Sequence, residues 1–126
     1  MKRLWIALIL LGAILAGTLL HARALRSFTG EVTGLLDLAQ AAAGAGRWAD
    51  AAALTGRAEK LWSQRETALH ILLRHGDTDA IAINFRETRA LLEGEDYGAF
   101  AAATAQLTAQ LELLSQAEEL TVENLF

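Results

Sequence analysis

The sequence predicts an all-α protein in which an N-terminal transmembrane helix continues into an antiparallel bundle of about four helices. Three observations support this fold class. The chain contains no proline. Apolar residues recur at helical spacing along almost its whole length, and no stretch alternates with the period of two that is typical of a strand. Finally, residues 4–20, LWIALILLGAILAGTLL, contain no charged side chain.

The apolar run at residues 4–20 predicts a membrane span that contacts lipid. Its 17 residues reach the lower limit of about 17 for a spanning helix. They exceed the apolar region of about 7–15 residues in a typical signal peptide. The sequence Ala22-Arg23-Ala24 nevertheless has the A-x-A form of a cleavage site, so cleavage after Ala24 is the alternative. We expect a retained anchor over residues 1–24 and a helical domain over residues 25–126.

The flanking charges determine the orientation of this anchor only weakly. Lys2 and Arg3 precede the apolar run, and Arg23 and Arg26 follow it, so the positive-inside bias is nearly balanced. A very short N-terminus ahead of an apolar run is typical of a signal anchor. We therefore expect a single-pass protein of the cell membrane, with its N-terminus in the cytoplasm and its domain outside.

The charge of the two parts differs in sign. Residues 1–26 contain four basic and no acidic residues, whereas residues 27–126 contain seven basic and all 15 acidic residues, a net charge of −8. Residues 90–126 have no Lys, Arg or His. Such a domain is repelled by nucleic acid and by anionic membrane surfaces, so we expect no nucleic-acid partner. The chain also has no Cys, which excludes disulfides and Cys-based metal sites.

The first helix is expected to continue from the membrane run to about Ala43. Gly30 and Gly34 each weaken it by roughly 1 kcal/mol relative to Ala, which is compatible with a bend or a break there. The glycines at residues 44–46 are expected to end it in a left-handed cap. Its predicted inner face consists of Leu25, Phe28, Val32, Leu35, Ala39 and Ala42.

Three further helices follow from the same spacing. The second is predicted over residues 47–74, the third over residues 78–93, and the fourth from Tyr97 to a frayed end near Leu120. The inner stripe of the second is Trp48, Ala51, Thr55, Ala58, Trp62, Leu69 and Leu72; that of the third is Ile81, Phe85, Thr88 and Leu92; that of the fourth is Tyr97, Phe100, Thr104, Leu107, Leu111 and Leu114. Short loops predict antiparallel neighbours.

One turn pattern recurs and resembles the turns of tetratricopeptide helix pairs. It is GRWADA at residues 46–51, and DYGAF at residues 96–100 echoes it. The two aromatic residues are 49 positions apart, whereas the tetratricopeptide period is 34. We therefore interpret the pattern as helix-hairpin geometry, in which the aromatic ring closes the turn, rather than as a tetratricopeptide array.

The sequence offers few candidate catalytic or metal-binding groups. His70 and His75 are five residues apart, so they lack the i, i+4 spacing of a shared metal site. A site built from His75, Asp77 and Asp79 is conceivable, but helix capping by Asp77 or Thr78 explains the pattern better. The glutamates near the C-terminus are interpreted as a solvated face. We expect no catalytic residue, no metal and no cofactor, and we do not expect an enzyme.

Trp48 and Trp62 have two interpretations. They are almost four helical turns apart, so both rings point the same way, and a bundle of this size needs the roughly 150–250 Å² that each ring buries. A partner-binding groove lined by both rings is the alternative. In the membrane run, two small-xxx-small pairs beginning at Gly12 and Ala13 would allow close helix packing, so a homo-oligomer is compatible with the sequence.

Several features also carry a family resemblance. They are a short basic start, one apolar helix, the turn at residues 46–51, Trp62, the stretch HGDTDAI at residues 75–81 and the ending ENLF at residues 123–126. Together they resemble the bacterial family named only as domain of unknown function 4363. Thr78 departs from it, because an apolar residue is more usual there. The resemblance implies a membrane-anchored helical protein, transfers no catalytic residue, and singles out His75, Asp79 and Asn124.

Three functional hypotheses remain open from the sequence. The first is a non-enzymatic accessory protein whose anchor holds an acidic helical domain at the outer membrane face, where it binds another membrane protein. The second is a ligand-binding or enzymatic domain with a site near Trp62, His75 and Asp79. The third is a secreted helical domain released after Ala24.

Overall fold

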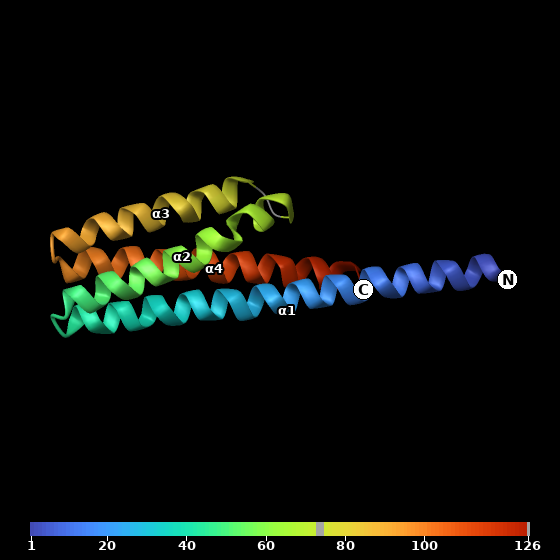
Figure 1. Cartoon of the computed structure of the whole chain (residues 1–126), viewed down its shortest axis with the longest axis horizontal. Helices are drawn as coiled ribbons and strands as arrows, with labels where there is room; N and C mark the ends of the chain where they lie inside the picture. Colours follow the sequence, from blue (N-terminus) through green and yellow to red (C-terminus); the bar gives the residue numbers. More distant parts are fainter. Residues whose placement is uncertain (73–74, 126) are drawn as a thin grey trace.

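The computed structural model of the chain contains four helices (Figure 1). It describes the backbone of residues 1–72 and 75–125, and the side chains within these ranges except 67–72, 75, 77, 118, 119, 121–123 and 125. The helices are α1 (Lys2–Gly44), α2 (Trp48–Leu72), α3 (His75–Glu93) and α4 (Tyr97–Leu125). No strand occurs in the described ranges. The predicted all-α fold class is confirmed.

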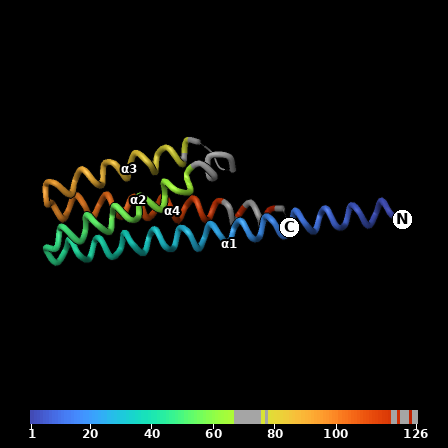
Figure 2. Tube along the Cα trace, viewed as in Figure 1, coloured from blue at the N-terminus to red at the C-terminus, as the bar shows by residue number. Residues whose placement is uncertain are grey.

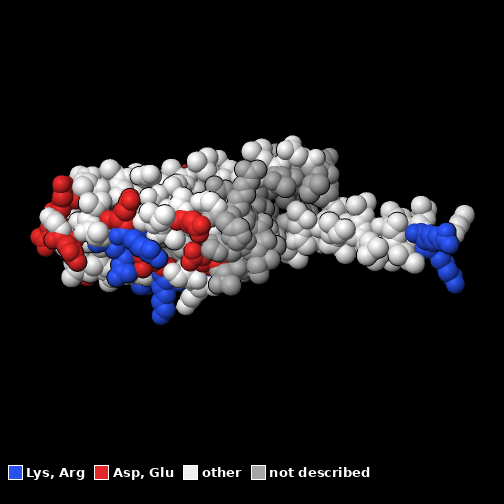
Figure 3. All heavy atoms as spheres, turned by 90° about the horizontal axis from the view of Figure 1, so that it is seen from above, with Lys and Arg blue, Asp and Glu red and all other residues white. Residues whose placement is uncertain are grey.

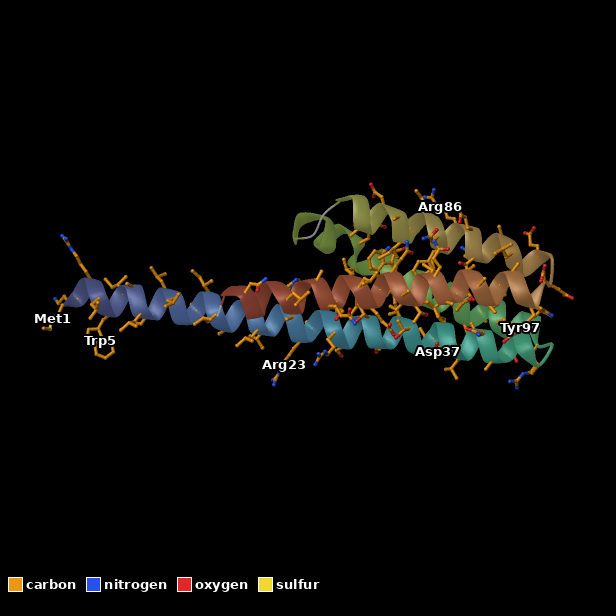
Figure 4. All side chains as sticks on the ribbon, turned by 180° about the vertical axis from the view of Figure 1, so that it is seen from behind. Met1, Trp5, Arg23, Asp37, Arg86 and Tyr97 are labelled. Atoms are coloured by element: carbon orange, nitrogen blue, oxygen red, sulfur yellow. The ribbon has the colours of Figure 1, made fainter. Side chains whose placement is uncertain are left out.

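The helices form an up-and-down bundle from which α1 projects. α1 packs on α2 and α4, and α3 packs on the same two helices from the opposite side. The backbone trace shows that α2, α3 and α4 lie alongside only the second half of α1 (Figure 2). The end of α4 lies beside the middle of α1, in front and rear views alike (Figures 1 and 4). At about 1.5 Å per residue, the 43 residues of α1 form a rod of about 65 Å.

The α1–α2 turn ends α1 by a Schellman motif, as the glycines at residues 44–46 predicted. Gly46 adopts φ +78°, a left-handed conformation that glycine tolerates without a Cβ penalty. The Arg47 N–H then donates to the Ala42 carbonyl at 2.9 Å, and the Gly46 N–H donates to the Ala43 carbonyl at 3.0 Å. These two bonds satisfy carbonyls that the end of a helix would otherwise leave unpaired.

The α3–α4 turn has the same length and a related geometry. Glu95 takes the left-handed conformation, with φ 49°. Asp96 caps α4, because its Oδ1 accepts a hydrogen bond from the Ala99 N–H at 3.3 Å. The Tyr97 ring lies against Gly44, so that a Cβ at Gly44 would come within 3.3 Å of it. The two turns therefore meet at the end of the bundle away from the N-terminus.

The core consists of two clusters along the bundle axis. The cluster nearer the turns is built on small residues and one ring: Ala39, Ala42, Ala43, Ala51 and Phe100. The other cluster is bulkier and contains Leu25, Phe28, Val32, Leu36, Ala58, Trp62, Ile81, Phe85, Leu107, Leu111 and Leu114. Leu36 is fully buried and Leu35 only partly so, which corrects the predicted inner face of α1 by one residue. Tyr97, predicted in the inner stripe of the fourth helix, is 44% exposed. The side chains of Leu69 and Leu72 lie outside the described residues.

Other boundaries differ from those predicted. α3 begins at His75, not at Thr78. Thr78 is fully buried, because it continues the inner stripe of Ile81 and Phe85 by one more turn. The interpretation of Thr78 or Asp77 as a helix cap is therefore wrong, and His75 lies at the start of α3 rather than at the end of α2. α1 passes Gly30 without a break, and α4 continues to Leu125 rather than fraying near Leu120.

The buried positions of the two hairpins correspond at a constant offset of 49 residues. Thr29 corresponds to Thr78, and Thr55 to Thr104, all four being buried. Thr55 and Thr104 also make the same bond: each hydroxyl donates to the carbonyl four residues earlier, at 2.8 and 2.7 Å. The further buried pairs are Val32 and Ile81, Leu36 and Phe85, Ala39 and Thr88, Ala51 and Phe100, Ala58 and Leu107, and Trp62 and Leu111. The bundle is thus two similar helical hairpins packed together.

Candidate functional site

The most distinctive surface of the molecule is the first half of α1. α1 is long and apolar enough to cross a membrane, by length and composition, and none of its most apolar 18-residue window is buried inside the protein. Ile9 and Leu20 are each 66% exposed. A signal sequence meets the same criteria of length and composition, as does the core helix of a soluble protein. The lack of burial distinguishes this segment from a core helix.

Burial in α1 begins where the bundle begins. Leu25 is 3% exposed, and Phe28, Thr29 and Val32 follow it into the core at helical spacing. There is no linker between the exposed and the buried segment, because both belong to one uninterrupted helix. The direction of the exposed segment therefore fixes the direction of the bundle axis.

Beyond its first turn, the exposed segment pairs its backbone groups and the Thr18 hydroxyl within the helix. Its backbone amides and carbonyls are paired within the helix, as a lipid environment requires. Thr18 is the one polar residue within residues 4–20, and its hydroxyl donates to the Ile14 carbonyl at 2.7 Å. The Trp5 indole N–H is the other side-chain donor within residues 4–20, and it lies near the free end of the helix.

Charged and aromatic side chains mark the ends of the exposed segment. Lys2 and Arg3 lie at the free end next to Trp5, and Arg23 lies where the bundle begins (Figure 4). The space-filling view shows a shaft of uncharged residues between the basic tip and the bundle, with acidic residues at the far end (Figure 3). Basic side chains at both ends of an apolar helix, with a tryptophan at one of them, are typical of the membrane–water interface.

The structure places the two tryptophans in different core clusters. Trp48 is partly buried and packs edge-on against Phe100, with ring centroids 6.0 Å apart. Trp62 is 1% exposed and stacks on Phe28 at 6.2 Å, and the Arg65 guanidinium lies 5.0 Å from the same Phe28 ring. Both tryptophans therefore contribute packing, as the core interpretation expected, and their contacts do not join them in one groove.

The other residues singled out by the sequence lie on α3 and α4. Asp79 is exposed on α3, and Asn124 is exposed near the end of α4. His75 begins α3, and its side chain lies outside the described residues. Among the described residues, no group of three His, Asp or Glu is arranged to hold a metal ion.

Sequence reasoning missed two features between helices. A cavity of about 170 Å³ lies between α2 and α3, with Trp62 and Arg86 in its wall, and the buried Trp62 Nε1 has no hydrogen-bond partner. A larger apolar hollow lies between α3 and α4 beside Leu113, which is 64% exposed. The signal for this hollow was a second apolar spacing on α4, outside the inner stripe.

These observations define a class: an all-helical bundle carried on a long helix whose free half is apolar and unburied. Comparison with protein-family models identifies the family as Domain of unknown function (DUF4363), matched over residues 19–125. The chain belongs to this family, as its motifs suggested. Comparison with curated proteins and with solved structures gave no match.

Proposed function

We propose that this chain is a non-enzymatic, membrane-anchored accessory protein. The first half of α1 crosses the membrane. The bundle lies at the outer face of the membrane, where its acidic surface binds another membrane protein. The observation that carries the proposal is the unburied apolar half of α1, continuous with the bundle. Burying such a surface in lipid removes a large apolar area from water, at about 25 cal/mol per Å².

Two observations favour a retained anchor over cleavage after Ala24. The region matched by the family begins at residue 19, so this cleavage would remove part of it. The new N-terminus would be Leu25, which is 3% exposed in the core. A core residue would then stand in the first turn of the shortened helix, where the backbone N–H groups have no intrahelical partner.

The continuous α1 also fixes the position of the bundle relative to the membrane. With no linker, the bundle projects directly from the membrane surface. The α1–α2 and α3–α4 turns then lie at the end of the bundle away from the membrane. That end bears Glu93, Glu95 and Asp96, which an anionic surface repels. The bundle therefore meets a partner at a defined height above the membrane, whereas a domain on a flexible linker would move freely.

The retained anchor is tested by alkaline extraction of membranes that contain the full chain, followed by measurement of its intact mass. We expect the chain in the membrane pellet with residues 1–24 present. Recovery in the supernatant with a mass beginning at Leu25 would contradict the anchor and favour the secreted domain.

The orientation is tested with single thiols, because the chain has no Cys. Ala45→Cys places a thiol in the exposed α1–α2 turn, and Lys2→Cys places one at the other end of α1. A membrane-impermeant maleimide should label Ala45→Cys on intact cells and Lys2→Cys only after permeabilisation. The reverse labelling would place the domain in the cytoplasm.

The accessory role is tested by crosslinking in membranes and affinity capture from detergent extracts. We expect a second membrane protein to be recovered with the full chain, and to be lost when the crosslinker is omitted and the detergent is stringent. Recovery of this chain alone in every detergent would contradict the proposed role.

A further inference from the structure

The outer face of α4 carries a second apolar stripe that the bundle leaves uncovered. Leu113 is 64% exposed and Leu120 is 57% exposed, and Ala117 lies between them on the same face. The inner stripe of α4 is separate: Leu107 and Leu111 are fully buried. Scattered surface leucines are ordinary, whereas a contiguous apolar patch indicates a contact surface.

The stripe borders a hollow of about 340 Å³ between α3 and α4. The described side chains that line it are uncharged: Ala80, Ile81, Gln110, Leu113, Leu114 and Ala117. Asn84 Nδ2 donates to Gln110 Oε1 at 2.6 Å, which ties the two helices together beside the hollow. Ile83 adds a further 52%-exposed apolar side chain on α3.

The spacing of the stripe is that of a coiled-coil seam. Gln110, Leu113, Ala117, Leu120 and Asn124 follow one another at intervals of 3, 4, 3 and 4. Both leucines then occupy d positions, and amide side chains occupy two of the three a positions. In parallel coiled coils leucine at d suits two strands, and a polar amide at a fixes the register and the number of strands.

We propose that this α4 stripe is the contact surface for a second copy of the chain, with the two α4 helices parallel. The proposal rests on the proposed membrane anchor, because two copies held in one membrane with the same orientation necessarily have parallel bundles. A twofold axis along the bundles then brings identical residues together at the same height. Leu113 meets its counterpart, and so does Leu120, as an isologous interface requires.

Charge supports a second copy at this face. Residues 27–126 carry a net charge of −8, so two copies repel each other over most orientations. The described residues of the hollow's wall are uncharged, so at this wall the two acidic domains can approach without those residues placing like charges opposite each other. The exposed Leu113 of each copy then packs against its counterpart at the edge of the two hollows, as a residue at a d position does in a parallel seam.

The test uses single-cysteine variants of the full chain in membranes and a short bismaleimide crosslinker. Leu113→Cys should give a covalent species of twice the chain mass. Leu38→Cys is the matched control, since Leu38 is also an exposed leucine, 58% exposed, on α1, which does not pack on α3. We expect at least a five-fold higher dimer yield at position 113. Equal yields at both positions, or crosslinking of Leu113→Cys only to a different protein, would overturn the proposal.

A second pair of variants guards against a trivial failure. Ala117→Cys should also give the dimer, because it lies one turn along the same stripe. Adding Leu120→Lys to either variant should lower the yield several-fold without changing helix content, since like charges would face each other across the seam. If the chain remains in the alkali-washed membrane pellet but neither variant forms a dimer, the contact surface is wrong and the anchor stands. If dimers form in a chain that leaves the membrane, the anchor is wrong.

Discussion

The two halves of α1 have similar side chains and opposite environments. Leu10 and Leu11 in the first half are 58% and 55% exposed, whereas Leu25 and Leu36 in the second are 3% and 0% exposed. The same helix therefore places leucines in two different environments. After residue 24 they lie in the protein interior, and before it, by our proposal, they lie in lipid. The difference is in the other helices, which lie alongside only the second half, where α2 and α4 pack on it (Figure 2).

The largest expected effect comes from charging the first half. Leu10→Arg with Ile14→Arg places two guanidinium groups near the centre of the proposed span, at about 2.5–3.5 kcal/mol each on insertion scales. We expect the chain to move from the membrane pellet to the supernatant. Leu38→Arg is the matched control, because Leu38 has the same 58% exposure as Leu10 but lies beyond the span. Pelleting of both variants with membranes would break the comparison.

Truncating a leucine should affect folding only in the second half. Leu36→Ala removes a fully buried side chain, which typically costs about 2–5 kcal/mol of unfolding free energy. Leu11→Ala removes a 55%-exposed one and should leave the stability of the bundle unchanged within about 0.5 kcal/mol. Denaturant unfolding in mild detergent, followed by helical circular dichroism, measures both. Equal losses would mean that the first half is also packed in the protein.

Two glycines near the bundle should respond with opposite signs. Gly46→Ala forces a side chain into φ +78°, so we expect a loss of about 1–2 kcal/mol. Gly30→Ala adds a Cβ with nothing within 4 Å, so we expect a gain of about 1 kcal/mol from helix propensity. The same unfolding measurement decides both signs. A loss at Gly30 would indicate a contact at that surface that the isolated chain does not show.

The fold was predictable because helical periodicity dominates this chain. Four helices, the two tight turns and most of the core followed from the spacing of apolar residues and from the glycines that end α1. The start of α3 was not predicted correctly, because Thr78 was interpreted as a cap although its spacing to Ile81 also fits the inner stripe. A threonine can serve either purpose, and only the packing of α3 against its neighbours decides between them.

The candidate site was predictable in part. The apolar run at residues 4–20 identified the segment that the structure leaves unburied. The contact stripe on α4 was not recognised, because Leu113 lies one position from the inner Leu114. A single helix of leucine and alanine supports two overlapping stripes, and burial is needed to separate the inner from the outer one. The 49-residue correspondence showed in the sequence only as a pair of aromatic turns, because most of the paired core residues differ in type.

The central claim is that lipid surrounds the first half of α1 and water surrounds the outer face of the second. Spin labels at Leu10→Cys and Leu38→Cys, in full-length chain reconstituted into vesicles, test it directly by collision with oxygen and with a water-soluble nickel chelate. The account predicts that the label at position 10 collides mainly with oxygen and the label at position 38 mainly with nickel. Ready access of nickel to both positions would contradict it.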